Sequence, residues 1–186
     1  MKKNLLSFLA FLIINFCFSQ TNWNADLAHS SIVFSVSHFK ISKVVGNFNK
    51  FNITTKTQND FKNPAFEVTI DASSIDTNQK SRDNHLKSSD FFDVAKFPNI
   101  KFASDKFEKL NDDDFSVTGK IILKGISKEI TFKGKINGII SDSKGKQKAG
   151  LSLQTVIKRE TFKIGSKMSP IGNDVSVTIN LQLHQQ

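Results

Sequence analysis

The sequence predicts an all-β protein: a barrel or sandwich of about eight antiparallel strands, interrupted by one short helical segment. Apolar and polar residues alternate over many short stretches, which is the pattern of half-buried strands. Turn-forming sequences such as QNDFKNP, EKLNDDD and SPIGND separate these stretches. Helical spacing is confined to residues 73–94 and one turn near residues 160–163. Short strands at such close spacing are typical of a barrel or sandwich.

Alternation defines the strands in chain order. In SIVFSVSH, Ile32, Phe34, Val36 and His38 share one face, and in VSVTINLQL the apolar face runs from Val175 to Leu183. The complete set of expected strands is residues 31–38, 44–56, 65–71, 99–104, 114–123, 128–140, 149–157 and 175–183. Glycines that interrupt these patterns predict bulges or sharp bends, which would help the strands close into a barrel; they are Gly46, Gly119, Gly134 and Gly138.

The first nineteen residues have the plan of a secretory signal peptide. Lys2 and Lys3 precede an apolar run that is too short for a comfortable bilayer span, and Cys17 and Ser19 fit the −3 and −1 positions. We therefore expect cleavage after Ser19 and one mature domain, residues 20–186. A lipoprotein anchor on Cys17 is the alternative, but Phe16 stands where that signal has a small residue.

The mature chain offers little for catalysis or metal binding. Removing residues 1–19 lowers the net charge from +9 to +7 and removes the single cysteine. The remaining lysines are scattered, which favours a solvated surface over nucleic-acid binding and leaves attraction to anionic lipid headgroups as a milder alternative. The histidines lack the spacing of metal ligands, and neither a nucleophile elbow nor a phosphate loop occurs; the histidines are His29, His38, His85 and His184.

Aromatic composition indicates an apolar interior. The sequence holds 18 phenylalanines, one tryptophan and no tyrosine, and phenylalanine has no polar group to place at a surface. An eight-stranded barrel is near the size at which the inside either fills with side chains or encloses one small ligand. Composition leaves both options open.

Four segments in order resemble the YceI-like family of polyisoprenoid-binding, lipocalin-like periplasmic proteins. They are DLAHSSIVFSVSHFKISKVVGNF, SIDTNQKSRDNHLKSSDFFDVAKFPNIKFAS, VTGKIILKGISKEITF and RETFKIG, and the match runs from about Trp23 to Leu183. The resemblance implies an extended eight-stranded lipocalin-like barrel in the periplasm. It also implies an elongated apolar cavity for a polyisoprenoid, a quinone-like molecule or another long-chain amphiphile, and no catalytic residues. One departure is that Lys163 stands where the family's Arg-x-x-Phe-Gly pattern has its glycine.

With that resemblance, the alternating faces predict which residues would line the cavity. The expected lining is Phe34, Val36, His38, Phe66, Val68, Ile70, Phe102, Val177, Ile179 and Leu181, and the ligand headgroup candidates are His38 and Arg159. A register slip of one residue would invert each face. The resemblance also allows a homodimer, and the sequence leaves the oligomeric state open.

The stretch RDNHLKSSDFFD is either an active site or a structural plug that closes one mouth of the barrel. We interpret it as the plug, built from Arg82, Asp83, His85, Leu86, Asp90, Phe91, Phe92 and Asp93. Ser81 is expected to cap a short helix through Leu86, with Asp83 favouring the helix dipole. Leu86, Phe91 and Phe92 would point into the barrel end, while Arg82, Asp90 and Asp93 tie the segment to its neighbours.

The sequence therefore favours a non-enzymatic carrier of a long-chain amphiphilic lipid. A rival hypothesis is a structural or interaction protein with a completely filled barrel, acting through its basic surface or on a protein partner. An enzyme is the third and weakest hypothesis.

Overall fold

The computed structural model describes residues 20–58, 61–167 and 170–186, so the expected signal peptide, residues 1–19, lies outside the described residues. This part of the chain contains eleven strands: β1 Thr21–Ala25, β2 Ser31–His38, β3 Ser42–Phe48, β4 Phe51–Gln58, β5 Lys62–Asp71, β6 Ile75–Asp76, β7 Asn99–Lys109, β8 Asp114–Leu123, β9 Ile126–Ser141, β10 Gln147–Lys158 and β11 Ile171–Gln185. One α-helix, α1 Lys80–Lys87, and three 3₁₀ turns, η1 Leu27–His29, η3 Ala72–Ser74 and η4 Arg159–Phe162, complete it.

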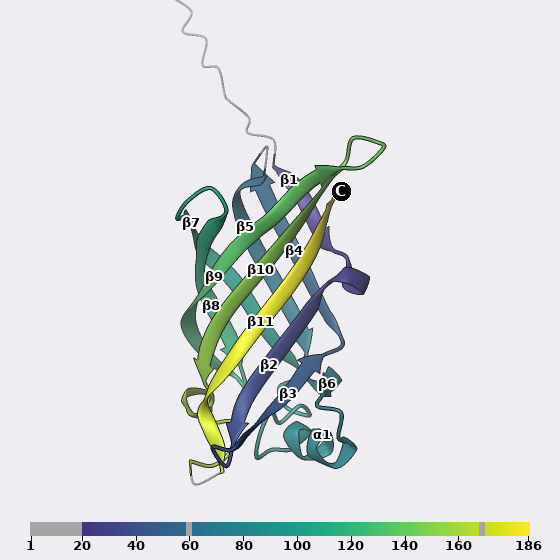
Figure 1. Ribbon diagram of the computed structural model, residues 1–186. Helices are drawn as coiled ribbons and strands as arrows, with labels where there is room; N and C mark the ends of the chain where they lie inside the picture. The colour runs from purple at the N-terminus through teal and green to yellow at the C-terminus, as the bar shows by residue number, and fades with distance from the viewer. Residues whose placement is uncertain (1–19, 59–60, 168–169) are drawn as a thin grey trace, which may run out of the picture.

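The strands close into a single antiparallel barrel (Figure 1). β1 and β2 follow one another along the edge of β11, and β1 closes the ring by pairing with both β11 and β4. β3 and β4 likewise form one interrupted strand, as do β5 and β6, because β3 pairs with β6 while β4 pairs with β5. Counted in this way the barrel has eight strands, which confirms the predicted all-β barrel with one short helix. Among the described residues, no helix has the length and apolar character to cross a bilayer.

Two details differ from the sequence-based expectation. The strand expected over residues 44–56 is broken at Asn49 and Lys50, where the Asn49 amide donates to the Ser74 carbonyl at 3.1 Å. This break lets the two halves pair with different neighbours. β1 was not expected because its sequence, TNWNA, carries a single large apolar residue, Trp23, and so shows no repeated alternation.

Only some of the strand glycines mark a bulge. The register shifts between Ser104 and Lys106, directly opposite Gly119, and next to Gly138 on the β9–β10 pair. Pairing continues without a shift through Gly46 and Gly134. At these two positions an aromatic ring lies where a side chain would be: a Cβ on Gly46 would lie 2.5 Å from Cζ of Phe34, and a Cβ on Gly134 would lie 2.2 Å from Cε2 of Phe115.

One end of the barrel is packed with side chains, and we call it the filled end. It holds the start of β1 and the end of β11 (Figure 1). Trp23 packs edge-on against Phe61 with ring centroids 5.0 Å apart, and its indole N–H donates to the buried Thr57 hydroxyl at 2.9 Å. Phe115, Leu183 and their neighbours are almost completely inaccessible to solvent. The opposite end, near the β2–β3 turn and α1, is different, and we call it the hollow end.

Candidate functional site

The hollow end encloses a cavity of about 600 Å³. Its walls are rows of inward-facing side chains that alternate along the strands, as the two-residue period of a strand requires. β2 contributes Ile32, Phe34, Val36 and His38, and β11 contributes Val175, Val177, Ile179 and Leu181. The next inward residue of β11, Leu183, belongs to the filled end, so the floor of the cavity lies between Leu181 and Leu183. The volume lies within the range of cavities that hold one small ligand.

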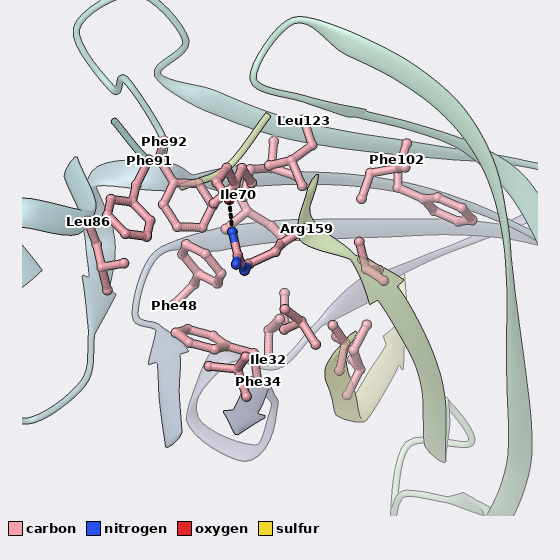
Figure 2. A pocket seen from close by; sticks show the side chains of 18 of the residues that line it. Ile32, Phe34, Phe48, Ile70, Leu86, Phe91, Phe92, Phe102, Leu123 and Arg159 are labelled. Carbon is pink, nitrogen blue, oxygen red and sulfur yellow. Dashed lines mark hydrogen bonds between the residues drawn. The ribbon is translucent and has the colours of Figure 1, made fainter. Parts of the chain in front are cut away.

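All ten residues expected from the sequence to line a cavity lie on this wall: Phe34, Val36, His38, Phe66, Val68, Ile70, Phe102, Val177, Ile179 and Leu181. Figure 2 shows several of them pointing toward a common space. Sequence reasoning missed the contribution of β8 and β10, which includes Val117, Ile121, Leu123, Leu153 and Ile157. The signal was present, because these residues alternate in phase, but the sequence alone does not say which strands surround the cavity and which surround the filled end.

Polar side chains gather where the cavity opens. Several lining residues at this point are exposed to solvent: Gln79, Ser81 and His85 on and before α1, and Pro170 just before β11. The opening therefore lies between α1 and Pro170. No group of three His, Cys, Asp or Glu side chains within the described ranges could hold a metal ion. Apolar walls with polar groups at one end suit an amphiphile, because its tail and headgroup need different surroundings.

His38 lies at the rim of the cavity. It is the last residue of β2, it pairs with Ile171 of β11, and it is half-buried. Its imidazole packs edge-on against the Phe39 ring with centroids 4.5 Å apart. This expected headgroup residue therefore borders both the cavity and the outer tip of the β2–β3 turn.

Arg159, the second headgroup candidate, lines the cavity but is only 4% exposed. Its guanidinium donates to four backbone carbonyl oxygens: Nε to Gly172 at 2.9 Å, Nη1 to Ile164 at 2.8 Å, and Nη2 to Ser166 at 3.1 Å and Ile171 at 2.9 Å. The Glu160 carboxylate lies 3.8 Å from Nη2. Since a guanidinium has five N–H donors, most of its capacity holds η4 against the start of β11. At most one N–H remains for a ligand.

The turn after Arg159 keeps the backbone shape that a glycine would favour. Lys163 has φ of 54°, in the left-handed region, although it has a side chain. Its amide donates to the Glu160 carbonyl at 3.0 Å, and its own carbonyl accepts from the Lys124 ammonium at 2.9 Å. At the position where the Arg-x-x-Phe-Gly pattern has its glycine, Lys163 therefore adopts the left-handed conformation that glycine favours.

The segment Arg82–Asp93 lies at the hollow end, and α1 is anchored there through Thr77. The Arg82 guanidinium donates to the Thr77 hydroxyl and carbonyl, each at 2.7 Å. The Asp83 carboxylate accepts from the Thr77 amide at 2.9 Å and from its hydroxyl. The predicted cap was wrong: the helix begins at Lys80, and the Gln79 side chain, not Ser81, accepts from the Arg82 amide. Gln79 lies one turn before Arg82, so it reaches that amide directly.

The rest of this segment divides between the cavity and the surface. Leu86, Phe91 and Phe92 line the cavity, and Phe92 packs edge-on against Phe48 with centroids 5.9 Å apart. His85 also lines it, but the 3.6 Å contact between His85 and the Asp90 carboxylate joins two exposed groups, which makes it weak.

The aspartates of the segment serve the backbone or the surface. The Asp90 carbonyl accepts from the Gly165 amide at 2.8 Å, so Asp90 ties the segment to the turn after η4. Asp93 has φ of 49°, and its amide donates to the Ser88 carbonyl at 2.8 Å, within its own turn. The Asp93 carbonyl also accepts from the Lys96 amide at 3.0 Å and from the Phe97 amide at 2.8 Å, so Asp93 joins the segment to the turn that follows it. No aspartate of the segment contributes to the cavity wall.

A closed eight-stranded antiparallel barrel with an apolar cavity that opens at one end defines a lipocalin-like class of fold. The comparison with protein families agrees with that class. The model of the YceI-like domain matches residues 23–183, and the chain belongs to this family.

Individual relatives support the assignment. Protein YceI of Salmonella newport is 33% identical over an alignment of 193 residues that covers all of both chains. The crystal structure of the Campylobacter jejuni YCEI protein is 32% identical, with a TM-score of 0.74, and the match covers 81% of this chain and 90% of that one. A polyisoprenoid binding domain from Saccharophagus degradans shares the fold, with a TM-score of 0.66 and 13% identity over 88% of this chain and 98% of that one.

Proposed function

We propose that this protein is a non-enzymatic carrier that holds the tail of a long-chain isoprenoid, quinone-like or other amphiphilic lipid in the hollow end. The observation that carries the proposal is the cavity itself: about 600 Å³, apolar along its walls, with polar groups at the opening. Its family and the fold it shares with a polyisoprenoid binding domain support the same ligand class. The headgroup would lie at the open end, within reach of His38 and the remaining Arg159 donor.

The physical basis of carriage is partition between two apolar environments. A lipid tail in water would gain about 0.8 kcal/mol per CH₂ group on burial, but its real alternative is a bilayer, where the tail is already dry. The cavity therefore needs only to be about as apolar as lipid. Polar contacts at the opening would then select the headgroup. Under this proposal α1 and the following turn act as a cap on the cavity, and their charges serve the fold and not a reaction.

We further propose that this activity lies outside the cytoplasm, because residues 1–19 have the plan of a secretory signal peptide. If residues 1–19 direct export, the carrier works in the periplasm, where lipids that move between membranes must cross water. A hydrophobic cavity would shield one such tail during the crossing. This localisation is part of the proposal.

Native mass spectrometry tests the proposal directly. The chain would be expressed with its leader, purified from the periplasm and then extracted with organic solvent. A discrete additional mass that appears in the solvent with a long-chain or isoprenoid signature is the expected result. An unliganded mass that persists after incubation with quinones and prenyl lipids would contradict it.

A matched pair of variants ties the ligand to the cavity. Val177 faces the cavity and its neighbour Ser176 faces solvent on the same strand. Val177→Trp should fill the cavity and lower occupancy, whereas Ser176→Trp should leave occupancy unchanged. Phe34→Asp should also lower occupancy, because a carboxylate on the wall is unfavourable beside an apolar tail. Equal ligand occupancy in the folded Val177→Trp and Ser176→Trp variants would show that the ligand binds outside the cavity.

A further inference from the structure

The β2–β3 turn exposes two large apolar side chains at the hollow end. Phe39 is 61% exposed and Ile41 is 88% exposed. Lys40 lies between them and Lys43 follows, and both are exposed as well. From Leu27 to Asn59 the chain has no acidic residue. The tip of this turn is therefore apolar, and the charged residues near it in sequence are all lysines.

The conformation of the turn does not explain these residues. Phe39 and Lys40 have φ of 51° and 61°, and the Ile41 amide donates to the His38 carbonyl at 3.2 Å. Positive φ at both central positions is the mark of a type I′ turn, for which Asn-Gly is favoured and bulky side chains are costly. Phe39 and Lys40 therefore stand at the tip in a backbone conformation that disfavours their side chains. Such a conflict points to a role outside the fold.

The turn stands beside the opening of the cavity. The Phe39 amide donates to the Pro170 carbonyl at 2.9 Å, and Pro170 is one of the exposed residues that line the opening. The His38 ring touches the Phe39 ring on one side and the cavity on the other. Figure 1 shows the β2–β3 turn and α1 at the same end of the barrel. A surface that bound this tip would therefore face the route by which a ligand enters.

We propose that the β2–β3 turn is a docking element for membranes that contain anionic lipids. Phe39 and Ile41 insert at the boundary between headgroups and acyl chains, while Lys40 and Lys43 contact lipid phosphates. Docking brings the open end against the bilayer, so that a tail can pass into the cavity without crossing water. This transfer step rests on the proposed function, but docking itself does not require a bound cargo.

Vesicle binding tests docking. The full mature chain would be sedimented with phosphatidylcholine vesicles, with and without phosphatidylglycerol. Binding should require the anionic lipid and fall as salt rises. Phe39→Ser combined with Ile41→Ser should weaken binding by roughly tenfold or more, because the inserted apolar area is lost. Lys40→Gln combined with Lys43→Gln should weaken it by about thirtyfold, since each lysine near an anionic surface contributes a factor of about five.

The opposite end of the barrel provides a matched control. Leu110 and Ile140 are 63% and 66% exposed, and both lie toward the filled end. Leu110→Ser combined with Ile140→Ser removes a similar exposed apolar area and should leave vesicle binding unchanged. If this control weakens binding as much as the Phe39/Ile41 pair does, apolar surface in general is responsible, and the proposal is overturned.

A tryptophan at the tip separates the membrane from a second copy of the chain. In Phe39→Trp, the emission of the new indole should shift to shorter wavelength only when anionic vesicles are added. A shift that depends on protein concentration without vesicles, together with dimers in sedimentation velocity, would overturn docking and assign the tip to a dimer interface. The two proposals also fail separately: an empty cavity in native mass spectrometry contradicts carriage, whereas loss of tip-dependent vesicle binding contradicts docking.

Discussion

The two ends of the barrel are built by the same strands from the same alternating pattern, yet the apolar interior of one is packed with side chains and that of the other encloses a cavity of about 600 Å³. At the filled end the inward positions carry large side chains such as Trp23, Phe115 and Leu183. Along the hollow end, β11 contributes Val175 and Val177, which are shorter. The cavity wall also carries large rings such as Phe34, Phe66 and Phe102, so the interior volume is decided by how far all the side chains at one level reach across the ring, and not by the size of one residue. Hydrophobicity alone does not distinguish the ends.

Glycines opposite aromatic residues add to this difference. A Cβ on Gly46 would lie 2.5 Å from Cζ of Phe34, and a Cβ on Gly119 would lie 2.8 Å from Cζ of Phe102. Both rings line the cavity, and the missing side chain of each glycine gives them room to approach the wall. At the filled end Phe115 covers Gly134 in the same way, but the remaining space is taken by neighbours such as Phe107, whose ring centroid lies 5.1 Å away. The same packing of a phenylalanine ring against a glycine therefore forms part of the cavity wall at one end and part of the core at the other.

Truncation should give the largest difference between the ends. Phe115→Ala removes a ring from a closely packed region and should lower the free energy of unfolding by about 3–5 kcal/mol. Val177→Ala, on the cavity wall, should cost less than about 1.5 kcal/mol, because its side chain already lacks neighbours on one side. Urea unfolding monitored by circular dichroism measures both. Equal losses would mean that the hollow end is packed in solution.

Arg159 should be the most costly polar residue at the hollow end. Arg159→Met keeps most of the side-chain volume but leaves four backbone carbonyls without their donor, and should lower the free energy of unfolding by roughly 3 kcal/mol. Lys158→Met, one residue earlier and exposed, should change it by less than about 0.5 kcal/mol. The same urea titration compares the two. If the arginine variant were as stable as the lysine variant, the bonds to η4 and β11 would not hold the turn.

Two glycines on β9 test the aromatic cover at the filled end. In Gly134→Ala the new methyl group would collide with the Phe115 ring, and we expect a loss of about 1–3 kcal/mol. Gly138 has no atom within 4 Å of its added Cβ, so Gly138→Ala should be neutral or slightly stabilising. Thermal unfolding of the two variants in parallel checks this. A neutral Gly134→Ala would show that Phe115 can move, contrary to its close packing.

The smallest expected effect is a gain at the hollow end. Lys163→Gly relieves the left-handed conformation and should raise the free energy of unfolding by up to about 1 kcal/mol. Lys163→Ala removes the same charge but keeps a Cβ, so it should bring no comparable gain. The difference between their unfolding midpoints isolates the backbone contribution. A gain for alanine as large as that for glycine would assign the effect to charge.

The sequence alone predicted the all-β class, about eight strands, the place of the short helical segment and the residues that share one face of a strand, such as Phe34 and Val36. The eight-stranded barrel, and with it the face that points inward, came from the resemblance to the YceI-like family. Alternation is a local property of each strand, so it can be read without knowing the neighbours. The predicted cap of α1 was wrong because Gln79 and Ser81 are both close enough in sequence to cap the helix. Only the path of the backbone decides which of the two side chains does so.

Tertiary structure decided the properties that depend on several strands at once. Whether the barrel is filled or hollow depends on the sum of side-chain volumes at one level around the ring, and that level is set by strand register. The Arg159 guanidinium is committed to carbonyls of residues 164–172, which only the closure of the turn brings around it. The apolar tip at Phe39 suggests a function only because it lies beside the opening of the cavity. Several segments of the chain form that opening, so no single strand predicts it. Local sequence sets which way a side chain faces, whereas what it faces is set by the closed barrel.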